Sequence, residues 1–207
     1  MHKFTDFFSQ MKLVFATNNS HKLQEIKHLL DESIELLCLN DINCNDDIPE
    51  NQETLEGNAA EKSFYIFNKY GFNCFSDDTG LEIEALNGEP GVYSARYAGA
   101  KRSAEMNMDL VLSKMAKIKN RKARFRTVIS LVIDGREIQF EGIVSGRISE
   151  EKLGATGFGY DPIFLPDESH LSFAEMSMGE KNKISHRGRA VLKLVEYLTQ
   201  LKPDEAI

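Results

Sequence analysis

The chain has 207 residues, of which 42% are hydrophobic and 28% charged, and its formal net charge is -7. This length and composition are typical of a folded globular domain and exclude a largely disordered chain. The acidic excess disfavours a nucleic-acid polymer as partner, because such binders usually carry a basic excess, so any phosphate must be bound at a local site.

The first part of the chain predicts a β-α-β unit. Residues 12–16 form an apolar run typical of a short buried strand, and residues 34–39 predict a second strand. Between them, Ser20 is the predicted N-cap of a helix whose apolar residues recur at helical spacing. Residues 44–52 are polar and acidic, which predicts a loop.

The next part is predicted to hold a helix and two short strands separated by an acidic loop. Thr54 is the predicted N-cap of a helix that runs to about Tyr70. Residues 73–75 predict a strand that ends in a loop over residues 76–80, where the sequence is Ser-Asp-Asp-Thr-Gly. Residues 81–85 then alternate apolar and acidic side chains, which is typical of a half-buried strand.

The second half of the chain adds a helix, a hairpin and a closing helix. Residues 103–117 predict the first of these helices. Residues 124–133 and 137–145 flank Asp134-Gly135, a strong signal for a two-residue β-hairpin turn. Residues 185–201 predict the closing helix. Because no repeat, low-complexity tract or linker interrupts this order, the sequence predicts one mixed α/β unit.

Cysteine and histidine usage bears on location and on zinc. The three cysteines are an odd number without CxxC spacing, which favours a reduced intracellular compartment over a disulfide framework. The five histidines form neither HExxH nor a Cys/His cluster, so we expect no zinc site. No apolar run approaches the roughly 20 residues of a membrane span, and residues 1–10 lack a signal-peptide core. We therefore predict a cytoplasmic protein without membrane contact.

A polar turn between the first strand and the first helix is the first candidate site. A helix N-terminus offers free backbone N–H groups and a partial positive charge, which suits a phosphate, and Lys22 adds a full charge. The alternative is an ordinary strand-to-helix turn rich in capping residues. The turn consists of Thr17, Asn18, Asn19, Ser20, His21 and Lys22.

Two acidic segments form the next candidates. Asp77 and Asp78 are adjacent carboxylates on a predicted loop, a costly arrangement that Mg²⁺ would neutralise. The alternative is an acidic turn closed by glycine. Glu50 could likewise be a metal ligand, and Lys62 could reach a phosphate from its helix, although a solvated acidic loop and a charged helix face would look the same. Asp46 and Asp47 are interpreted only as part of a solvated acidic loop.

A glycine-rich segment and a basic segment complete the candidates. Residues 154–162 have the spacing G-x-x-G-x-G, which differs from the dinucleotide fingerprint, and Pro162 argues against a following helix. Phe158 and Tyr160 could stack on a nucleobase there, or they could be buried in a tight turn. Residues 180–189 are basic and could grip phosphates or a base carbonyl, or they could be the solvated start of a helix.

Taken together in this order, these segments resemble the inosine triphosphate pyrophosphatase family, which removes deaminated purines from the nucleotide pool. FATNNSHKLQEI is similar to the family's first strand and phosphate-binding turn, and SDDTGLEIEALNGEPGVYSARYAG is similar to its most specific block. TGFGYDPIF and EKNKISHRGRA complete the pattern, so the resemblance extends from Met11 to about Leu198.

The resemblance implies a fold, a reaction and an assembly. The fold is α/β, with a mixed long central sheet, flanking helices and two lobes around a substrate cleft, and the assembly is a homodimer. The reaction is the hydrolysis of ITP, dITP and XTP to the monophosphate and pyrophosphate by attack on the α-phosphorus, with Mg²⁺ as cofactor. Residues 1–10 have no counterpart and are expected to be an N-terminal extension before one nucleotide pyrophosphatase domain over residues 11–207.

The resemblance also assigns roles to individual residues. Asp78 corresponds to the family's catalytic carboxylate, and Glu50 and Asp78 are the expected metal ligands. Thr79 stands where many members have serine, so the hydroxyl is kept. The other expected substrate-binding residues are Thr17, Asn18, Asn19, Ser20, His21, Lys22 and Lys62 toward the triphosphate, and Phe158, Gly159, Tyr160, Asp161, Lys181, His186 and Arg187 around the nucleoside.

The sequence departs from the family pattern around Glu50. Gln52 and Glu53 replace residues that are more often small and apolar, and Gly57 stands where glutamate is frequent. These departures weaken the placement of Glu50 more than that of Asp78.

Base choice follows from hydrogen-bond complementarity. Deaminated purines carry an oxygen at position 6, so the pocket should present donors there, and Arg187 with Lys181 and His186 can supply them. Phe158 or Tyr160 would supply the stacking face. Rejection of guanine needs a second device at position 2, which we assign to Asp161 or to a backbone carbonyl.

Two alternative functions remain open from the sequence. One is the related group of septum-inhibition nucleotide pyrophosphatases, which prefers modified pyrimidines or 7-methyl-GTP. The SHRG and FGYD segments argue against that group. The other is a nucleotide sensor that binds ITP with Mg²⁺ and releases no pyrophosphate, although a binder needs no carboxylate that activates water.

Overall fold

The computed structural model describes residues 11–27, 29–30 and 34–201, so the expected extension over residues 1–10 lies outside the described residues. The strands are β1 Met11–Phe15, β2 Ile34–Leu37, β3 Cys74–Ile83, β4 Pro90–Gly91, β5 Lys122–Ile133, β6 Arg136–Ile148 and β7 Phe164–Pro166. The α-helices are α1 Ser20–Lys27, α2 Leu55–Tyr70, α3 Ala104–Met115, α4 Met178–Ile184 and α5 His186–Gln200. Short 3-10 helices lie at Asn40–Ile42, Glu84–Leu86, Ser94–Arg96 and Asp161–Ile163.

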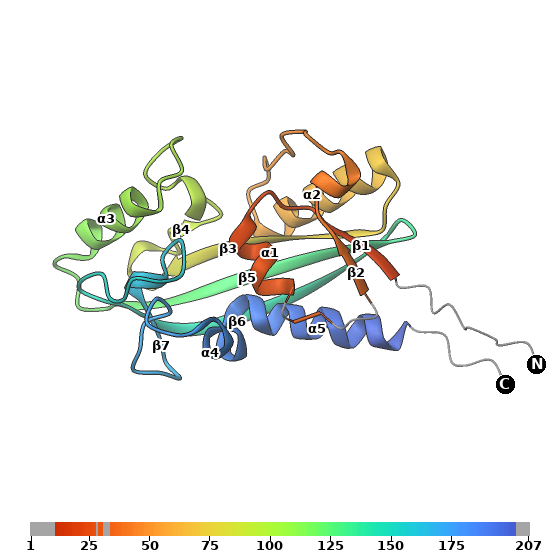
Figure 1. Ribbon diagram of the computed structural model, residues 1–207. Helices are drawn as coiled ribbons and strands as arrows, with labels where there is room; N and C mark the ends of the chain where they lie inside the picture. The colour runs from red at the N-terminus through yellow and green to blue at the C-terminus, as the bar shows by residue number, and fades with distance from the viewer. Residues whose placement is uncertain (1–10, 28, 31–33, 202–207) are drawn as a thin grey trace, which may run out of the picture.

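The strands form one mixed sheet in the order β2-β1-β3-β5-β6-β7, with β4 paired to β3. β1 is parallel to β2 and β3, whereas β3, β5, β6 and β7 pair antiparallel. The long strands β3, β5 and β6 run the length of the molecule, with α1 and α2 toward one end and α3 toward the other (Figure 1). The expected α/β class with a mixed central sheet and flanking helices is confirmed.

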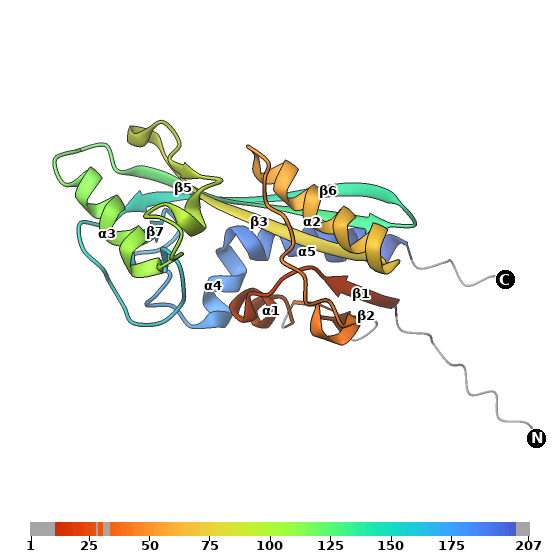
Figure 2. The same cartoon turned by 90° about the horizontal axis from the view of Figure 1, so that it is seen from above.

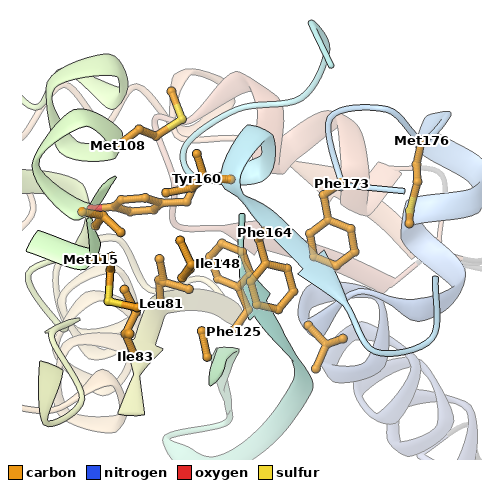
Figure 3. Close-up of a cluster of buried hydrophobic side chains, with 14 residues drawn as sticks. Leu81, Ile83, Met108, Met115, Phe125, Ile148, Tyr160, Phe164, Phe173 and Met176 are labelled. Carbon is orange, nitrogen blue, oxygen red and sulfur yellow. The ribbon is translucent and has the colours of Figure 1, made fainter. Parts of the chain in front are cut away.

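Helices cover both faces of the sheet. α2 packs on β3 and β5 from one side, and α5 packs on β5 and β6 from the other (Figures 1 and 2). Toward the α3 end, a cluster of buried side chains includes Phe125, Tyr160, Phe164 and Phe173 (Figure 3). Residues of β3 and β5 therefore alternate between two buried environments, because successive side chains of a strand point to opposite faces.

β3 corrects the prediction of two short strands separated by a loop. It is a single ten-residue strand that includes Asp77 and Asp78, and β5 pairs with it along its whole length. Asp and Gly are unfavourable in strands as isolated residues, but the continuous ladder to β5 outweighs that local preference. The two carboxylates therefore lie on a rigid strand.

Helix capping confirms one of the two predicted N-caps and corrects the other. Thr54 is the N-cap of α2, and Ser103 and Ser185, the first residues of two predicted helices, are the N-caps of α3 and α5; each side chain accepts a backbone N–H of the first turn. Ser20 is not the cap of α1, because the side chain of Asn19 accepts the backbone N–H of the first turn instead.

The C-terminal region contains a helix that the sequence analysis did not predict. α4 begins with a capping box formed by Ser177 and Glu180, and it ends where Ser185 begins α5. The basic segment was predicted as the start of one helix, whereas it spans two helices. The helix was missed because its short sequence, with Gly179 near its start, has no clear apolar stripe.

The predicted hairpin is confirmed. Asp134 and Gly135 connect β5 and β6, and both have positive φ, as a two-residue primed turn requires. In the described part of the chain, none of the helices has the length and apolar character that crossing a membrane requires.

We predict that Gly142→Ala strongly destabilises the fold, because α5 lies directly on the backbone of β6 there. A Cβ at Gly142 would lie 2.6 Å from the backbone nitrogen of Ala190 and closer still to the carbonyl oxygen of His186. Overpacking against backbone should lower the free energy of unfolding by about 3 kcal/mol or more.

Gly179→Ala in α4 is the matched control, since a Cβ there meets nothing within 4 Å. Alanine should leave stability unchanged or raise it by up to about 1 kcal/mol. Urea unfolding of both variants measures the difference, and equal stability of the two would contradict the close approach of α5 to β6.

Candidate active site

A cavity of about 870 Å³ opens beside the middle of β3. β1 pairs with β3 only at Val14 with Cys74 and at Phe15 with Phe75, and then leaves the sheet. The edge of β3 beyond Phe75 therefore has no neighbouring strand on that side until β4 pairs with Leu81 and Glu82. The five sequence segments that were singled out as candidates all contribute to the cavity wall.

All of the residues expected to bind substrate or metal line this cavity except Ser20, which lines a smaller adjacent pocket of about 150 Å³. The cavity-lining residues from that set are Thr17, Asn18, Asn19, His21, Lys22, Glu50, Lys62, Asp78, Thr79, Phe158, Gly159, Tyr160, Asp161, Lys181, His186 and Arg187.

The turn after β1 places Lys22 against β3. The hydroxyl of Thr17 accepts the backbone N–H of Asn19 at 3.2 Å, and the side chain of Asn19 accepts those of His21 and Lys22. Lys22 Nζ then donates to Asp77 Oδ1 at 2.8 Å and to the carbonyl oxygen of Asp77 at 3.4 Å. Lys22 of α1 thus places a positive charge at the open edge of β3.

Asp77 and Asp78 point to opposite faces of β3 because they are adjacent in a strand. Asp77 is fully buried and pairs with Lys22 and, at 3.2 Å, with Arg187. Burial opposes its ionisation, but Lys22, Arg187 and Lys62 together hold the pKa of Asp77 below its usual range. Its two carboxylate oxygens bind Lys22 and Arg187, so Asp77 holds these two cations in place in the site.

Asp78 lies on the α2 face and is open to the cavity. Asn58 Nδ2 donates to Asp78 Oδ2 at 3.1 Å, and Lys62 Nζ lies 3.6 Å from Asp78 Oδ1. Burial raises the pKa of Asp78 above its usual value, against the opposing influence of Lys62 and Lys22. A buried carboxylate whose negative charge is only partly balanced by nearby lysines is suited to take up a proton.

Lys62 joins Asp78 to the loop that carries Glu50. Its Nζ donates to Glu50 Oε1 at 2.7 Å and to the carbonyl oxygen of Asp77 at 2.8 Å. Burial would lower the pKa of Lys62, but Asp78, Glu50 and Asp77 raise it, so the ammonium is retained. Burial opposes the ionisation of Glu50, while Lys62 holds its pKa below the usual value.

The two expected metal ligands, Glu50 and Asp78, face one cavity and share Lys62 between them. Within the described residues, nowhere do three His, Cys, Asp or Glu side chains gather in a way that could hold a metal ion by themselves. Two carboxylates fit Mg²⁺, because this ion commonly takes one or two protein carboxylates and completes its shell with water and substrate phosphates.

The glycine-rich segment forms another part of the cavity wall, next to the turn that carries His21. The ring of Phe158 stacks on that of His21, with centroids 5.2 Å apart, and Lys181 Nζ lies 4.7 Å from the Phe158 centroid. Asp161 Oδ2 accepts the backbone N–H of Phe158 at 2.8 Å and pairs with Lys181 at 2.7 Å. The Phe158 ring therefore lies against His21 and next to the cations Lys181 and Arg187.

Tyr160 and His186 border the cavity from the hydrophobic core. Tyr160 is buried in the core cluster (Figure 3). Its hydroxyl donates to the carbonyl oxygen of Ser94 at 2.8 Å. The ring of His186 stacks on Phe125 at 4.5 Å, and burial next to Arg187 and Lys181 holds its pKa well below the usual value. Among the described residues, Nδ1 of this neutral imidazole has no hydrogen-bond partner.

Arg187 was expected to contact the base, but the structure shows it buried and bound to other side chains of the protein. It is only 2% exposed, and its three nitrogens donate to Asp77, Glu25 and Thr79. Arg187 also lines the cavity. Arg187 is therefore both a structural cation and a cavity-lining donor.

Glu25 is a site residue that the sequence analysis missed. It is buried in α1 and pairs with Lys181 at 2.8 Å and with Arg187. Burial opposes its ionisation, but Arg187 and Lys181 hold the pKa of Glu25 below its usual value. Its position three residues after Lys22 places it on the same helix face. That spacing was the available signal, but only apolar positions of the helix were considered.

Comparison with known proteins gives consistent matches along nearly the whole chain. Residues 13–197 match the model of the Ham1 family. The dITP/XTP pyrophosphatase of Flavobacterium johnsoniae is 54% identical over 192 residues, which cover 93% of this chain and 100% of that protein. The dITP/XTP pyrophosphatase of Christiangramia forsetii is 55% identical over 190 residues, which cover 92% and 100%. The structure of the Staphylococcus aureus Ham1 protein superposes with a TM-score of 0.85 at 38% identity, over 92% of this chain and 100% of that one.

We predict that Glu25→Gln lowers the free energy of unfolding by about 3–5 kcal/mol, because it removes one member of a buried charge network and leaves Arg187 and Lys181 undercompensated. Glu35→Gln on β2 is the control, since Glu35 is partly exposed and forms a longer ion pair with Lys12. It should change stability by no more than about 1 kcal/mol.

The pH dependence provides a second test of Glu25. Because its pKa is lowered in the folded protein, its stabilising contribution is present above the unfolded value of about 4.3 and is lost as the pH falls through the lower folded value. Urea unfolding at pH 7 should separate wild type from Glu25→Gln, and the gap should narrow in acid. Equal stability at pH 7 would contradict the structural role.

Proposed function

The chain belongs to the Ham1 family, and on that premise we propose that it hydrolyses dITP and XTP, together with ITP, to the nucleoside monophosphate and pyrophosphate in the cavity lined by Asp78. The observation that carries the proposal is that the segments from which this activity was predicted meet at one cavity. The relatives named dITP/XTP pyrophosphatase are more than half identical along their full length, and the predicted family is confirmed.

Family membership separates this proposal from the two alternatives. The named relatives act on dITP and XTP, which favours deaminated purines over the substrates of the septum-inhibition group. They are enzymes, which argues against a nucleotide sensor.

Asp78 is the proposed catalytic residue. Its carboxylate faces the cavity, whereas the oxygens of Asp77 are taken by Lys22 and Arg187, so of these two adjacent carboxylates Asp78 is the one available to orient and deprotonate the attacking water. Asn58 fixes one of its oxygens, which directs the carboxylate. Phosphoryl transfer depends mainly on positioning and charge neutralisation, so no nucleophilic serine or cysteine is required.

Lys62 and Lys22 complete the phosphate end of the site. Both are held on the edge of β3 through the carbonyl oxygen of Asp77, and both line the cavity. We propose that they bind the phosphates, with the turn from Thr17 to Lys22 offering backbone N–H groups. Glu50 and Asp78 would hold Mg²⁺, which when bound neutralises charge on the phosphates.

The nucleoside is proposed to bind at the other end, against Phe158. Two of the three N–H groups of Lys181 are directed to Glu25 and Asp161, which leaves one for the 6-oxygen of a deaminated purine. We propose that Arg187, which also lines the cavity, donates to the same 6-oxygen. Adenine would place its amino group against these donors and leave buried groups unpaired.

The larger architecture belongs to the same proposal. The α1-α2 end and the α3 end of the long strands would act as two lobes around the substrate cleft, within one domain over residues 11–207. Two copies would form a homodimer, which analytical ultracentrifugation measures.

We predict that Asp78→Asn reduces turnover of ITP by at least about 10²–10⁴-fold, the usual contribution of a general base, while the protein stays folded. Pyrophosphate release by the purified variant measures the loss. Asp134→Asn in the β5–β6 turn is the control, because it removes the same charge far from the cavity and should keep the wild-type rate. A near wild-type rate for Asp78→Asn would remove it from catalysis.

We predict a strong preference for deaminated purines in a panel of ITP, XTP, GTP and ATP with Mg²⁺. The kcat/KM for ITP should exceed that for ATP by on the order of 10⁴, because a donor-lined site leaves groups unpaired against adenine. XTP should be accepted and GTP rejected, and omission of Mg²⁺ should stop pyrophosphate release. Equal kcat/KM for ITP and ATP would show that Lys181 and Arg187 do not recognise the 6-oxygen.

A further inference from the structure

Arg102 is a cavity-lining cation that the proposed site does not use. It lies just before α3, on the opposite side of the cavity from α2, and its side chain is 60% exposed. Its Nη2 atom lies 3.9 Å from Glu50 Oε2, at the outer limit of an ion pair. Its backbone has a φ of +50°, a conformation that non-glycine residues rarely adopt and that is often kept at ligand sites.

The buried cations of the cavity are already matched by carboxylates. Lys22 pairs with Asp77 at 2.8 Å, and Lys62 pairs with Glu50 at 2.7 Å. At the other end, Lys181 lies within 2.8 Å of both its carboxylate partners. Arg102 differs, since its contact with Glu50 is long and solvent-exposed, and such a pair contributes little.

Arg102 also lies at one end of the network of charged side chains that lines the cavity. Ion pairs of alternating sign connect Asp161 to Lys181, Glu25, Arg187, Asp77 and Lys22. Lys62 donates to the backbone carbonyl oxygen of Asp77, and its own ion pairs connect it to Asp78 and Glu50, the partner of Arg102. Phe158 stands at the first end and Arg102 at the last. A nucleotide with its base on Phe158 and its α-phosphate near Asp78 would direct the outer phosphates toward Arg102.

Glu50 is the fixed member of the Glu50–Arg102 pair. Its loop is tied to α2 on both sides, because Asp46 accepts from Lys69 and Tyr70, and the backbone of Gln52 donates to Asn58 at 2.9 Å. Lys62 holds the other carboxylate oxygen of Glu50. Arg102 is therefore the member that can change its partner at little cost.

The N-terminus of α3 near Arg102 favours an anion, although the carboxylates of Asp47, Glu50 and Asp78 line the same cavity. Ala104 in the first turn of α3 lines the same cavity, so the positive end of that helix faces the space next to Arg102. A phosphate offers a guanidinium two parallel acceptors at normal hydrogen-bond distance, a stronger interaction than the 3.9 Å contact with Glu50.

We propose that Arg102 is a substrate-binding residue that leaves Glu50 and binds the outer phosphates of the nucleotide, the part that is released as pyrophosphate. This inference rests on the proposed function for the direction of the substrate. It makes Arg102 a residue by which the cavity distinguishes a triphosphate from a shorter nucleotide.

The experiment compares wild type, Arg102→Ala, Arg102→Lys and Lys101→Ala. Lys101 is the matched control, because it is an exposed neighbouring cation that does not line the cavity. Calorimetry with inorganic pyrophosphate in Mg²⁺ buffer measures binding without turnover. Steady-state kinetics with ITP and IDP measure whether the outer phosphate is recognised.

Arg102→Ala should weaken pyrophosphate binding and raise the KM for ITP by roughly tenfold, the usual effect of losing a charge-assisted hydrogen bond, with kcat little changed. The preference for ITP over IDP should fall by a similar factor. Arg102→Lys should restore part of the loss, because it keeps the charge and loses the two-point geometry. Lys101→Ala should match wild type.

Wild-type pyrophosphate affinity and an unchanged ITP-to-IDP preference in Arg102→Ala would overturn the inference. An equal loss in Lys101→Ala would also overturn it, since the effect would then be general surface charge. The inference would also be overturned if the wild-type protein showed no measurable affinity for pyrophosphate. Absence of pyrophosphate release from ITP would instead refute the proposed function, while the calorimetric comparison would still decide the role of Arg102.

Discussion

The burial of Asp77 in the middle of β3 is the constraint on which the site depends. Its side chain has no exposed surface, and a buried carboxylate without a partner is strongly destabilising. Lys22 from α1 and Arg187 from α5 supply the opposite charges, so two helices far apart in the chain must meet at one strand residue. Arg187 in turn pairs with Glu25, which also positions Lys181. One buried charge thus organises both ends of the cavity.

Because β3 is pleated, its two adjacent carboxylates point to opposite faces of the sheet and have different partners. Asp77 faces α1 and α5 and neutralises their cations, whereas Asp78 faces α2 and the cavity. The cavity exists because β1 stops pairing with β3 at Phe75, which leaves the carbonyl group of Asp77 free to accept from Lys22 and Lys62. A rigid strand edge, with paired ladders on its other side, therefore holds the groups that the proposed chemistry requires.

The sequence by itself determined the features that depend on residues close together in the chain. Thr54, Ser103 and Ser185 begin helices because a side-chain oxygen accepts a backbone N–H within the next turn. Asp134 and Gly135 form the hairpin because both tolerate positive φ. The four sequence blocks also indicated the family and the cavity-lining set, since their residue types and order suffice for that comparison.

Only the tertiary structure decided how these blocks act on one another. The continuity of β3 through two aspartates comes from pairing with β5, which overrides the local preference for a turn. Glu25 is a site residue because Arg187, 162 positions later, lies against it, and Arg187 reaches Asp77 across 110 positions. No local pattern encodes such partners. They are selected when helices pack on the two faces of the sheet and each buried charge must be met by its opposite.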